Sequence, residues 1–241
     1  ADHLVFAIGG LFGDWGAVAA FEADRLNRPF AVWTDRVESE VVRSRSGQGS
    51  RRSRIRALLT HRPMAQLERA VIRRAALGLF HGRETYDAYA PFSPDPQLVH
   101  DIHLSPQDRI PGAELAAKII RTTEDPLRLC YVGRADAMKG PGDWIDVLAH
   151  LAKRGTNFRA VWLGEGPQRP MLLKRAAEAG LGDRVEAPGF AEDRAQVLRT
   201  LREAQVFLFC HKTPESPRCL IEALVSGTPI VGYEGSFARD L

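Results

Sequence analysis

The chain has 241 residues, of which 44% are hydrophobic and 26% are charged. This composition excludes a disordered or collagen-like chain, and the length suits one large domain or two modest ones. The net charge of +3 gives no overall field that would favour nucleic acid as a partner. The most apolar runs, 4–12 and 206–210, fall short of the ~20 residues of a membrane span, and no basic stretch typical of a signal peptide precedes the first of them.

The first half of the chain, residues 1–126, has the pattern of an α/β domain. Short apolar runs predict strands at Leu4–Ile8, Phe30–Trp33, Leu77–Phe80 and Leu98–Ile102. Amphipathic runs predict helices at Trp15–Leu26 and Met64–Ala76. No opening strand and phosphate-type loop precedes the first run, and the chain stops directly after a strand and a turn. We therefore expect a sequence that lacks the start of this domain and the end of the next.

A strongly basic segment interrupts this half. From Arg43 to Arg74 there are ten arginines against one acid, Glu68, so the segment carries +9 and the remaining chain −6. Its Ser-, Gly- and Arg-rich start, Ser44–Ser53, predicts a mobile loop, and a helix with a basic outer face is predicted from Thr60 onward. The segment is either a solvated surface or an attachment site for anionic lipid. Nucleic acid is less favoured because no aromatic residues are interleaved for base stacking.

The second half, residues 127–241, follows the polar stretch Arg121–Pro126 and has a more regular pattern. Strands are predicted at Leu127–Val132, Phe158–Leu163, Arg184–Glu186, Val206–Cys210 and Pro229–Val231. Helices are predicted between them at Pro141–Lys153, Gln168–Ala179, Glu192–Ala204 and Ser216–Ser226. Strands that alternate with helices predict an α/β fold with a parallel sheet and helices on both faces.

In such a sheet, ligands bind outside the carboxyl ends of the strands. The loop Gly133–Gly140 follows the first strand of this half. Its glycines let the backbone approach a ligand, while Arg134 and Lys139 form a suitable cation pair for a diphosphate. The alternative is an ordinary strand-exit loop with two solvated cations.

The next two strand exits are less specific. Gly164 and Glu165 begin a tight turn after the second strand, and turn chemistry alone explains them. Phe190 follows the third strand, where it either lies against a nucleotide base or is an ordinary buried aromatic residue.

The densest cluster follows the fourth strand, from His211 to Glu222. Ser216 suits a helix N-cap and Pro217 the first helical position, and a helix N-terminus at the ligand edge of the sheet favours phosphate. Glu222 is placed to accept both hydroxyls of a ribose, and Glu215 to reach a sugar hydroxyl. Alternatively, Glu215 balances the helix dipole and Glu222 is a surface carboxylate.

Residues 127–241 resemble the nucleotide-sugar-binding domain of family-4 retaining glycosyltransferases, which have the GT-B fold of two Rossmann-like domains. The matching motifs are YVGRADAMKG (131–140), VWLGEGP (161–167), PGF (188–190) and PESPRCLIEALVSGTPIVGY (214–233). Residues 1–126 resemble, more weakly, the later part of the acceptor domain of the same family.

The resemblance implies a role for each matching residue. Arg134, Lys139 and Glu215 are the implied catalytic residues, with both cations on the diphosphate and Glu215 on the donor sugar. Glu222 is implied to bind the ribose, and the backbone near Phe190 to face the base. The implied nucleotide-sugar contacts also include Gly133, Gly164, Glu165, Ser216, Pro217, Arg218, Cys219 and Leu220. The family has seven residues between its two glutamates, whereas six separate Glu215 from Glu222.

The expected reaction is transfer of a sugar from a nucleoside diphosphate sugar to an acceptor hydroxyl, in glycan, polysaccharide or glycolipid biosynthesis. The resemblance implies retention of the anomeric configuration. The two cations and the helix end would replace a divalent metal ion, and no cofactor is expected. One alternative is a nucleotide-sugar epimerase or hydrolase that uses the histidines of the first half, His61, His81, His100 and His103. Another is a non-catalytic nucleotide-binding module.

Three cysteines, Cys130, Cys210 and Cys219, cannot all pair within the chain and lack the spacing of metal ligands. We expect them to be reduced thiols of a cytoplasmic protein. Attachment to the inner membrane face through Arg43–Arg74 is the alternative to a freely diffusing enzyme.

Overall fold

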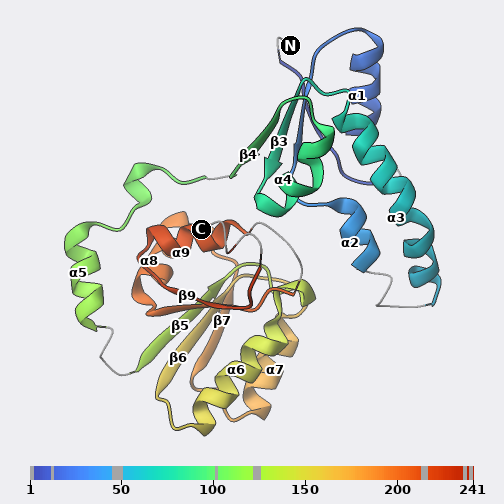
Figure 1. Cartoon of the computed structure of the whole chain (residues 1–241). Helices are drawn as coiled ribbons and strands as arrows, with labels where there is room; N and C mark the ends of the chain where they lie inside the picture. The colour runs from blue at the N-terminus through green and yellow to red at the C-terminus, as the bar shows by residue number, and fades with distance from the viewer. Residues whose placement is uncertain are drawn as a thin grey trace. The chain divides into compact units, whose positions relative to one another are not determined.

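The computed structural model describes residues 3–11, 14–44, 51–100, 103–121, 126–212, 217–235, 238 and 241 (Figure 1). The chain divides into two compact units, each with its own parallel sheet. The first unit consists mainly of residues up to 100, and the second mainly of residues from 103 to 234. The expected α/β fold is therefore present, but the division lies about 25 residues earlier than the predicted boundary at 126–127.

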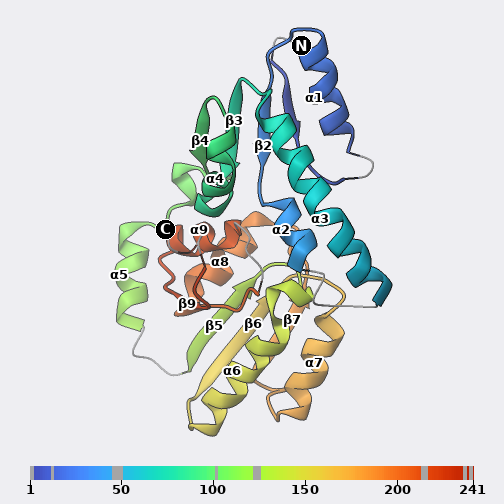
Figure 2. The ribbon, with the colours of Figure 1, turned by 45° about the vertical axis from the view of Figure 1, so that its right-hand side comes forward.

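The described strands of the first unit form a sheet in the order β1-β2-β3-β4. Its elements are β1 (Val5–Ala7), α1 (Trp15–Arg25), β2 (Ala31–Thr34), α2 (Glu38–Ser44), α3 (Arg51–Ile72), β3 (Leu77–His81), α4 (Arg83–Tyr89), the 3₁₀ turn η2 (Ala90–Phe92) and β4 (Pro96–Val99). All four predicted strands are present, although β4 begins two residues earlier than expected. Figures 1 and 2 both show α1 and α3 side by side along this sheet.

Small residues bring α1 close to its sheet. The Asp14 side chain caps this helix by accepting a hydrogen bond from the backbone N–H of Ala17, at 3.1 Å. Ala17, Ala20 and Ala23 recur on one face of the helix and are all buried. They pack into a core with Val32 and the other inward-facing residues of the sheet.

The basic segment differs from its prediction. Helix α3 begins at Arg51, so Arg51–Ser53 are helical and not part of a loop, and Ser44 is the last residue of α2. Residues 45–50 lie outside the described residues. Arginine, alanine and leucine favour helices, and Ala57, Met64 and Glu68 recur at helical spacing on the buried face. This propensity outweighs the loop-like composition of the first residues.

The second unit contains a sheet in the order β7-β6-β5-β8-β9 (Figure 2). Its elements are the 3₁₀ turn η3 (Pro106–Asp108), α5 (Gly112–Arg121), β5 (Leu127–Val132), the 3₁₀ turn η4 (Ala137–Lys139), α6 (Pro141–Lys153), β6 (Phe158–Leu163), α7 (Arg169–Glu178), β7 (Val185–Gly189), α8 (Arg194–Glu203), β8 (Val206–Phe209), α9 (Arg218–Val225) and β9 (Ile230–Gly232). The bounds of β5, β6 and α6 are the predicted ones. Helices α6 and α7 cover one face of this sheet, and α8 and α9 the other (Figure 1).

Large aromatic side chains fill the core of this second unit. The rings of Tyr131 and Trp162 lie 4.0 Å apart between centroids, and Trp144 of α6 packs edge-on against Trp162 at 5.5 Å. All three side chains are fully buried. Burial of such surface is the main stabilising contribution, and it anchors the loop that follows β5 to a rigid base.

A buried lysine ties α5 to the second unit. The Nζ atom of Lys118 donates to the Leu201 and Ser226 carbonyl oxygens at 3.2 Å and to the Thr228 hydroxyl at 2.6 Å. Burial lowers the pKa of Lys118 to about 8. The backbone N–H of Ile110 also donates to the Val225 carbonyl. These long-range contacts explain why the segment before β5 belongs to the second unit, which its local sequence does not reveal.

Candidate functional site

The second sheet reverses its strand order at β5. The chain passes from β5 to β6 and β7 on one side, and then returns to β8 on the other side of β5. The loops after β5 and β8 therefore leave the sheet at the point where ligands bind in open parallel sheets. The described strands of the first sheet follow one another in a single direction, without such a reversal.

Backbone hydrogen bonds join three strand-exit loops at this edge. The N–H groups of Gly133 and Ala135 donate to the carbonyls of Leu163 and Glu165, and both distances are 2.9 Å. On the other side, the N–H of Lys212 donates to the Met138 carbonyl at 2.9 Å. The exits of β5, β6 and β8 thus converge into one connected structure, as the sequence predicts.

Two glycines make this convergence possible. Gly140 has φ +68°, and a methyl group there would lie 2.0 Å from the Cys210 carbonyl oxygen. At Gly164, with φ +153°, a methyl group would lie 2.1 Å from the Gly133 carbonyl oxygen. Any larger residue at either position would push neighbouring loops apart, in addition to straining its own backbone.

A cavity of about 460 Å³ opens beside these loops. Its lining includes five of the predicted site residues: Gly133, Arg134, Gly164, Glu165 and Phe190. Ala191, which precedes α8, and Val197 of α8 complete an apolar wall. The volume lies in the range of small-molecule sites. The Phe190 side chain is 75% exposed, so its interpretation as a buried aromatic residue is wrong, and its ring is accessible to a ligand.

The second predicted cation lies on the β8 side of the β5 loop. Lys139 ends η4 and acts electrostatically on His211, which lies two residues after the end of β8. His211 is buried and lies 2.5 Å from the Tyr131 hydroxyl through Nε2. Burial, and then the charge of Lys139, lower the pKa of His211 to about 3, so the imidazole is neutral. This tyrosine–histidine pair is not predicted from the sequence, in which the two residues are 80 positions apart.

Helix α9 begins one residue later than predicted. Pro217 occupies the N-cap position and Arg218 the first helical position, whereas Ser216 and Glu215 lie outside the described residues. The next two residues, Cys219 and Leu220, are buried in the apolar core. A ligand contact by these two residues would therefore use their backbone, as at other helix N-termini that bind anions.

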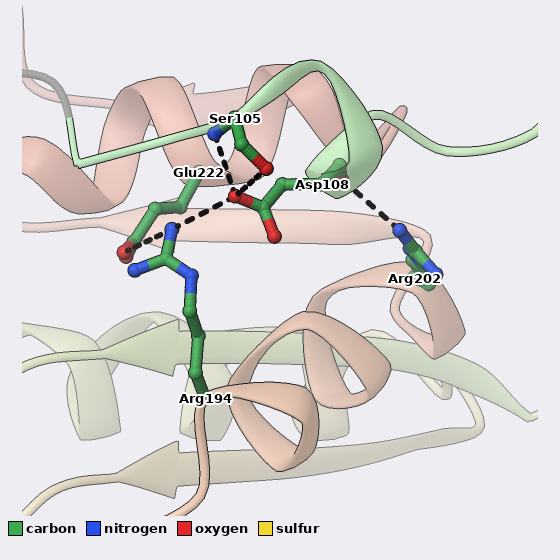
Figure 3. Close-up of polar contacts among 5 residues, drawn as sticks. All are labelled: Ser105, Asp108, Arg194, Arg202 and Glu222. Carbon is green, nitrogen blue, oxygen red and sulfur yellow. Dashed lines mark hydrogen bonds and ion pairs between the residues drawn. The ribbon is translucent and has the colours of Figure 1, made fainter.

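The predicted ribose ligand, Glu222, lies in a charged cluster between α8, α9 and the turn before α5 (Figure 3). Arg194 Nη2 is 4.0 Å from Glu222 Oε1 and 3.6 Å from Asp108 Oδ2. Burial raises the pKa of Glu222, while Arg194 and Arg218 oppose this shift. The interpretation as a plain surface carboxylate is wrong, because only 20% of the Glu222 side chain is exposed. Arg194 and Asp108 are not predicted as site residues, because no motif of the sequence contains them.

A second polar cluster fixes the exits of β8 and β9. Asp143, in the first turn of α6, accepts a hydrogen bond from the Tyr233 hydroxyl at 2.7 Å and pairs with Lys212 Nζ at 2.6 Å. Tyr233 directly follows β9, and Lys212 follows β8. The carboxylate thus links two strand exits to the helix that begins after the 133–140 loop.

The histidines proposed for an alternative chemistry do not gather in one unit. His81 is buried and packs near His100, with ring centroids 6.1 Å apart, in the first unit. His61 lies on α3, where its Nδ1 contacts backbone carbonyls. His103 instead belongs to the second unit and acts on Glu222.

Other site classes find no support in the described part of the chain. No group of three or more His, Cys, Asp or Glu residues there is arranged to hold a metal ion. No helix formed by the described residues is long and apolar enough to cross a bilayer. The three cysteines are all described; each is buried, and none of them forms a disulfide.

Comparison with solved structures supports the fold. The chain aligns with the Anabaena protein Alr3699/HepE in complex with UDP, with a TM-score of 0.72, 15% identity, and coverage of 99% of this chain and 62% of that one. Sucrose-phosphate synthase from Thermosynechococcus elongatus gives a TM-score of 0.70 at 17% identity, over 98% of this chain and 57% of that one. At these identities the likeness shows the fold alone, which is that of GT-B glycosyltransferases.

Comparison with curated sequences gives the family. A 2-deoxystreptamine N-acetyl-D-glucosaminyltransferase of Streptomyces fradiae is 31% identical over 193 residues, which are 76% of this chain and 45% of the relative. A 2-deoxystreptamine glucosyltransferase of Streptomyces kanamyceticus is 33% identical over 104 residues, 43% of this chain and 26% of the relative. The chain thus spans a quarter to a half of these relatives. Residues 114–241, more than half of the chain, match the family Glycosyl transferases group 1, and the chain belongs to this family.

Proposed function

We propose that this chain binds a nucleoside diphosphate sugar at the edge of the second sheet and transfers the sugar to an acceptor hydroxyl, in glycan, polysaccharide or glycolipid biosynthesis. The observation that carries the proposal is the convergence of the β5, β6 and β8 exits beside a cavity that Arg134 and Phe190 line. Further support comes from the relatives, which are named as glucosyl- and N-acetylglucosaminyltransferases, and from a neighbouring structure that contains UDP-glucose.

Each part of the donor has a candidate partner. The exposed ring of Phe190 suits stacking against the base, and Glu222 suits the ribose hydroxyls. The guanidinium of Arg134 and the ammonium of Lys139 suit the diphosphate, together with the backbone of the first turn of α9. Glu215 is the proposed contact of the donor sugar.

In the proposed reaction, the bond between the anomeric carbon and the diphosphate oxygen breaks, and a bond from the acceptor oxygen to that carbon forms. The hydroxyl proton passes to the departing phosphate. Negative charge grows on the diphosphate, and the cations Arg134 and Lys139 stabilise it without a metal ion. We further propose retention of the anomeric configuration, on the strength of the family resemblance.

Replacement of Arg134 tests this assignment. We expect Arg134→Ala to lower kcat by roughly 10²–10³-fold, the usual effect of losing one group that stabilises developing charge. Arg128→Ala is the matched control, because this exposed arginine lies near the start of β5, at the end of the strand away from the loop that carries Arg134. Steady-state kinetics with a panel of UDP- and GDP-sugars would measure both variants. Wild-type turnover of Arg134→Ala would refute the assignment.

Two other functions are separated by product analysis. An epimerase or hydrolase would release altered or free sugar without any acceptor, whereas a transferase would not. The burial of His81 disfavours it as the acid or base of such a reaction. A non-catalytic module would bind UDP or GDP in calorimetry and yet transfer nothing when acceptors are supplied.

We also propose that α3 attaches to an anionic lipid surface. Ile55, Leu58 and Leu59 are 57–71% exposed, and their spacing places them on one face of the helix. Arg51 and Arg62 lie on the same face by helical spacing. Apolar side chains flanked by cations are typical of a helix that lies in the membrane interface. Among the alternatives left open by the sequence, this exposed apolar stripe favours lipid attachment over a merely solvated surface.

Co-sedimentation with phosphatidylcholine vesicles that contain increasing phosphatidylserine tests the attachment. Binding should rise with the anionic fraction and fall with salt. Replacing both Arg51 and Arg62 by Gln should weaken binding by roughly 2 kcal/mol, or about 30-fold. Replacing Lys153 and Arg154 by Gln removes the same charge from the second unit and should have little effect. Binding that ignores the anionic fraction would contradict the proposal.

A further inference from the structure

Arg194 stands between two carboxylates that come from different elements (Figure 3). It is the first residue of α8, and its Nη2 atom is the one nearest to both acids. The distances are 4.0 Å to Glu222 Oε1 on α9 and 3.6 Å to Asp108 Oδ2 in the turn before α5. One guanidinium group thus balances two acids that would otherwise repel each other.

Hydrogen bonds fix the helix start that carries Arg194 and the carboxylate of Asp108 that faces it. Asp193 caps α8 by accepting a hydrogen bond from the N–H of Ala195 at 2.8 Å, which fixes the start of the helix. On the other side, Asp108 Oδ2 accepts hydrogen bonds from the N–H of Ser105 at 2.7 Å and from its hydroxyl at 3.2 Å. These backbone and side-chain bonds lower the pKa of Asp108 and keep it a charged partner.

Glu222 needs a cation at this place. An ionised carboxylate accepts hydrogen bonds from two ribose hydroxyls with two equivalent, charged oxygen atoms, whereas a protonated one turns one of its oxygens into a donor. Burial disfavours the ionised form of Glu222. The groups that face it are Arg194 from α8, Arg218 from its own helix, and His103 and Asp108 from the segment before α5. Asp108 disfavours a charge on Glu222, so Arg194 both offsets burial and screens the neighbouring acid.

We propose that Arg194 is a positioning residue, which keeps Glu222 ionised and oriented and thereby sets the preference of this site for ribose over deoxyribose. This inference rests on the proposed function, because it takes a nucleoside diphosphate as the ligand of Glu222. Arg194 acts through Glu222 and requires no contact of its own with the nucleotide.

Calorimetry with UDP and dUDP, and with GDP and dGDP, tests this role. The quantity compared is the Kd of the deoxyribonucleotide divided by the Kd of the ribonucleotide, so that a larger ratio means a stronger preference for ribose. Wild-type protein should prefer the ribonucleotide by on the order of tenfold or more, as expected for a hydrogen bond to a charged group. Glu222→Gln should bring the ratio close to one. Arg194→Gln should lower it by roughly threefold or more, and Arg194→Lys should restore part of it, because the charge is kept and the planar fork is lost.

Arg202→Gln is the matched control. Arg202 lies on the same helix and donates to the Asp108 carbonyl at 3.0 Å, but it pairs with Glu114 and not with Glu222. This variant should leave the ratio unchanged even where it lowers stability.

A pH series adds a second readout. As the pH is lowered, the preference for the ribonucleotide should begin to fall at a higher pH in Arg194→Gln than in wild type, because Glu222 takes up a proton more readily without the neighbouring cation.

The outcomes separate the inference from the proposed function. If Arg194→Gln weakens UDP and dUDP equally, as a purely structural residue would, the inference fails while nucleotide binding stands. A ratio that rises in Arg194→Gln would show a guanidinium that competes with ribose, and would also overturn it. If wild-type protein binds neither UDP nor GDP, the proposed function itself fails and the inference with it. The inference likewise fails if the wild-type ratio is close to one.

Discussion

His211 is a buried, neutral base at the end of β8, beside the lysine that we assign to the diphosphate. Its hydrogen bond to the Tyr131 hydroxyl joins the loop after β8 to the central strand β5. Its folded-state pKa of about 3 lies below the ordinary value of 6.5. Between these two values the unfolded chain binds a proton that the folded chain does not. His211 therefore destabilises the fold progressively as the pH falls from about 6.5 toward 3.

The free energy of unfolding of His211→Gln should accordingly decrease less than that of wild type as the pH is lowered. The free energy of unfolding of wild type should fall faster over pH 6.5–4.5, by roughly 1.4 kcal/mol per pH unit for one uncompensated proton. Urea titrations at several pH values would measure the difference. His150→Gln, at an exposed histidine of α6, should follow the wild-type curve. Parallel curves for His211→Gln and wild type would contradict the assignment of a buried neutral imidazole.

At the scale of elements, the loop 133–140 owes its position to glycine. It lies between the β6 and β8 exits, and its close approach to Cys210 requires that position 140 has no side chain. Gly140 also starts α6 from a left-handed conformation, with φ +68°. The loop carries both proposed diphosphate ligands. A displacement of its backbone at Gly140 would therefore also displace Arg134 and Lys139.

Gly140→Ala should therefore cost both stability and nucleotide affinity. Gly155→Ala is the matched control, because its φ of +78° is similar and nothing lies within 4 Å of the added methyl group. The left-handed strain alone should cost about 1–2 kcal/mol in each variant. The clash with Cys210 should make Gly140→Ala roughly 1–3 kcal/mol worse, as in other overpacked sites. Urea unfolding and UDP or GDP calorimetry would measure both, and equal losses in the two variants would contradict the close approach.

At the scale of the whole molecule, the segment before β5 is part of the second unit. Arg202 of α8 pairs with Glu114 of α5, and Lys118 reaches three oxygen atoms of the same unit. The segment also carries Asp108, which faces Arg194 in the proposed ribose site. The unit that we propose to bind the donor is thus larger than the alternation of strands and helices suggests.

A fragment of residues 103–241 should be more stable than one of residues 127–241. The shorter fragment loses the contacts of Lys118 and uncovers part of the core, which should cost roughly 2–4 kcal/mol or more. Lys118→Ala in the longer fragment should remove part of this advantage, while Lys153→Ala, at an exposed lysine, should not. Urea unfolding would compare the four proteins. Equal stability of the two fragments would contradict the observed division of the chain.

The local patterns of the sequence determined the α/β class, all nine described strands and the residues that leave the second sheet at its ligand edge. Hydrophobic periodicity, glycine placement and strand alternation suffice for this, because they record which face of each element is buried. The same patterns misplaced the start of α3, the boundary between the units and the first turn of α9.

Only the tertiary structure decided which side chains share an environment. Lys118 pairs with residues 83 to 110 positions away, and Arg194 joins Asp108 and Glu222 from two other elements. The same packing leaves the ring of Phe190 exposed, and it buries His211 so that its imidazole is neutral. Such contacts depend on how elements pack and not on spacing along the chain, because the protonation state and the accessibility of a group follow from its neighbours in space.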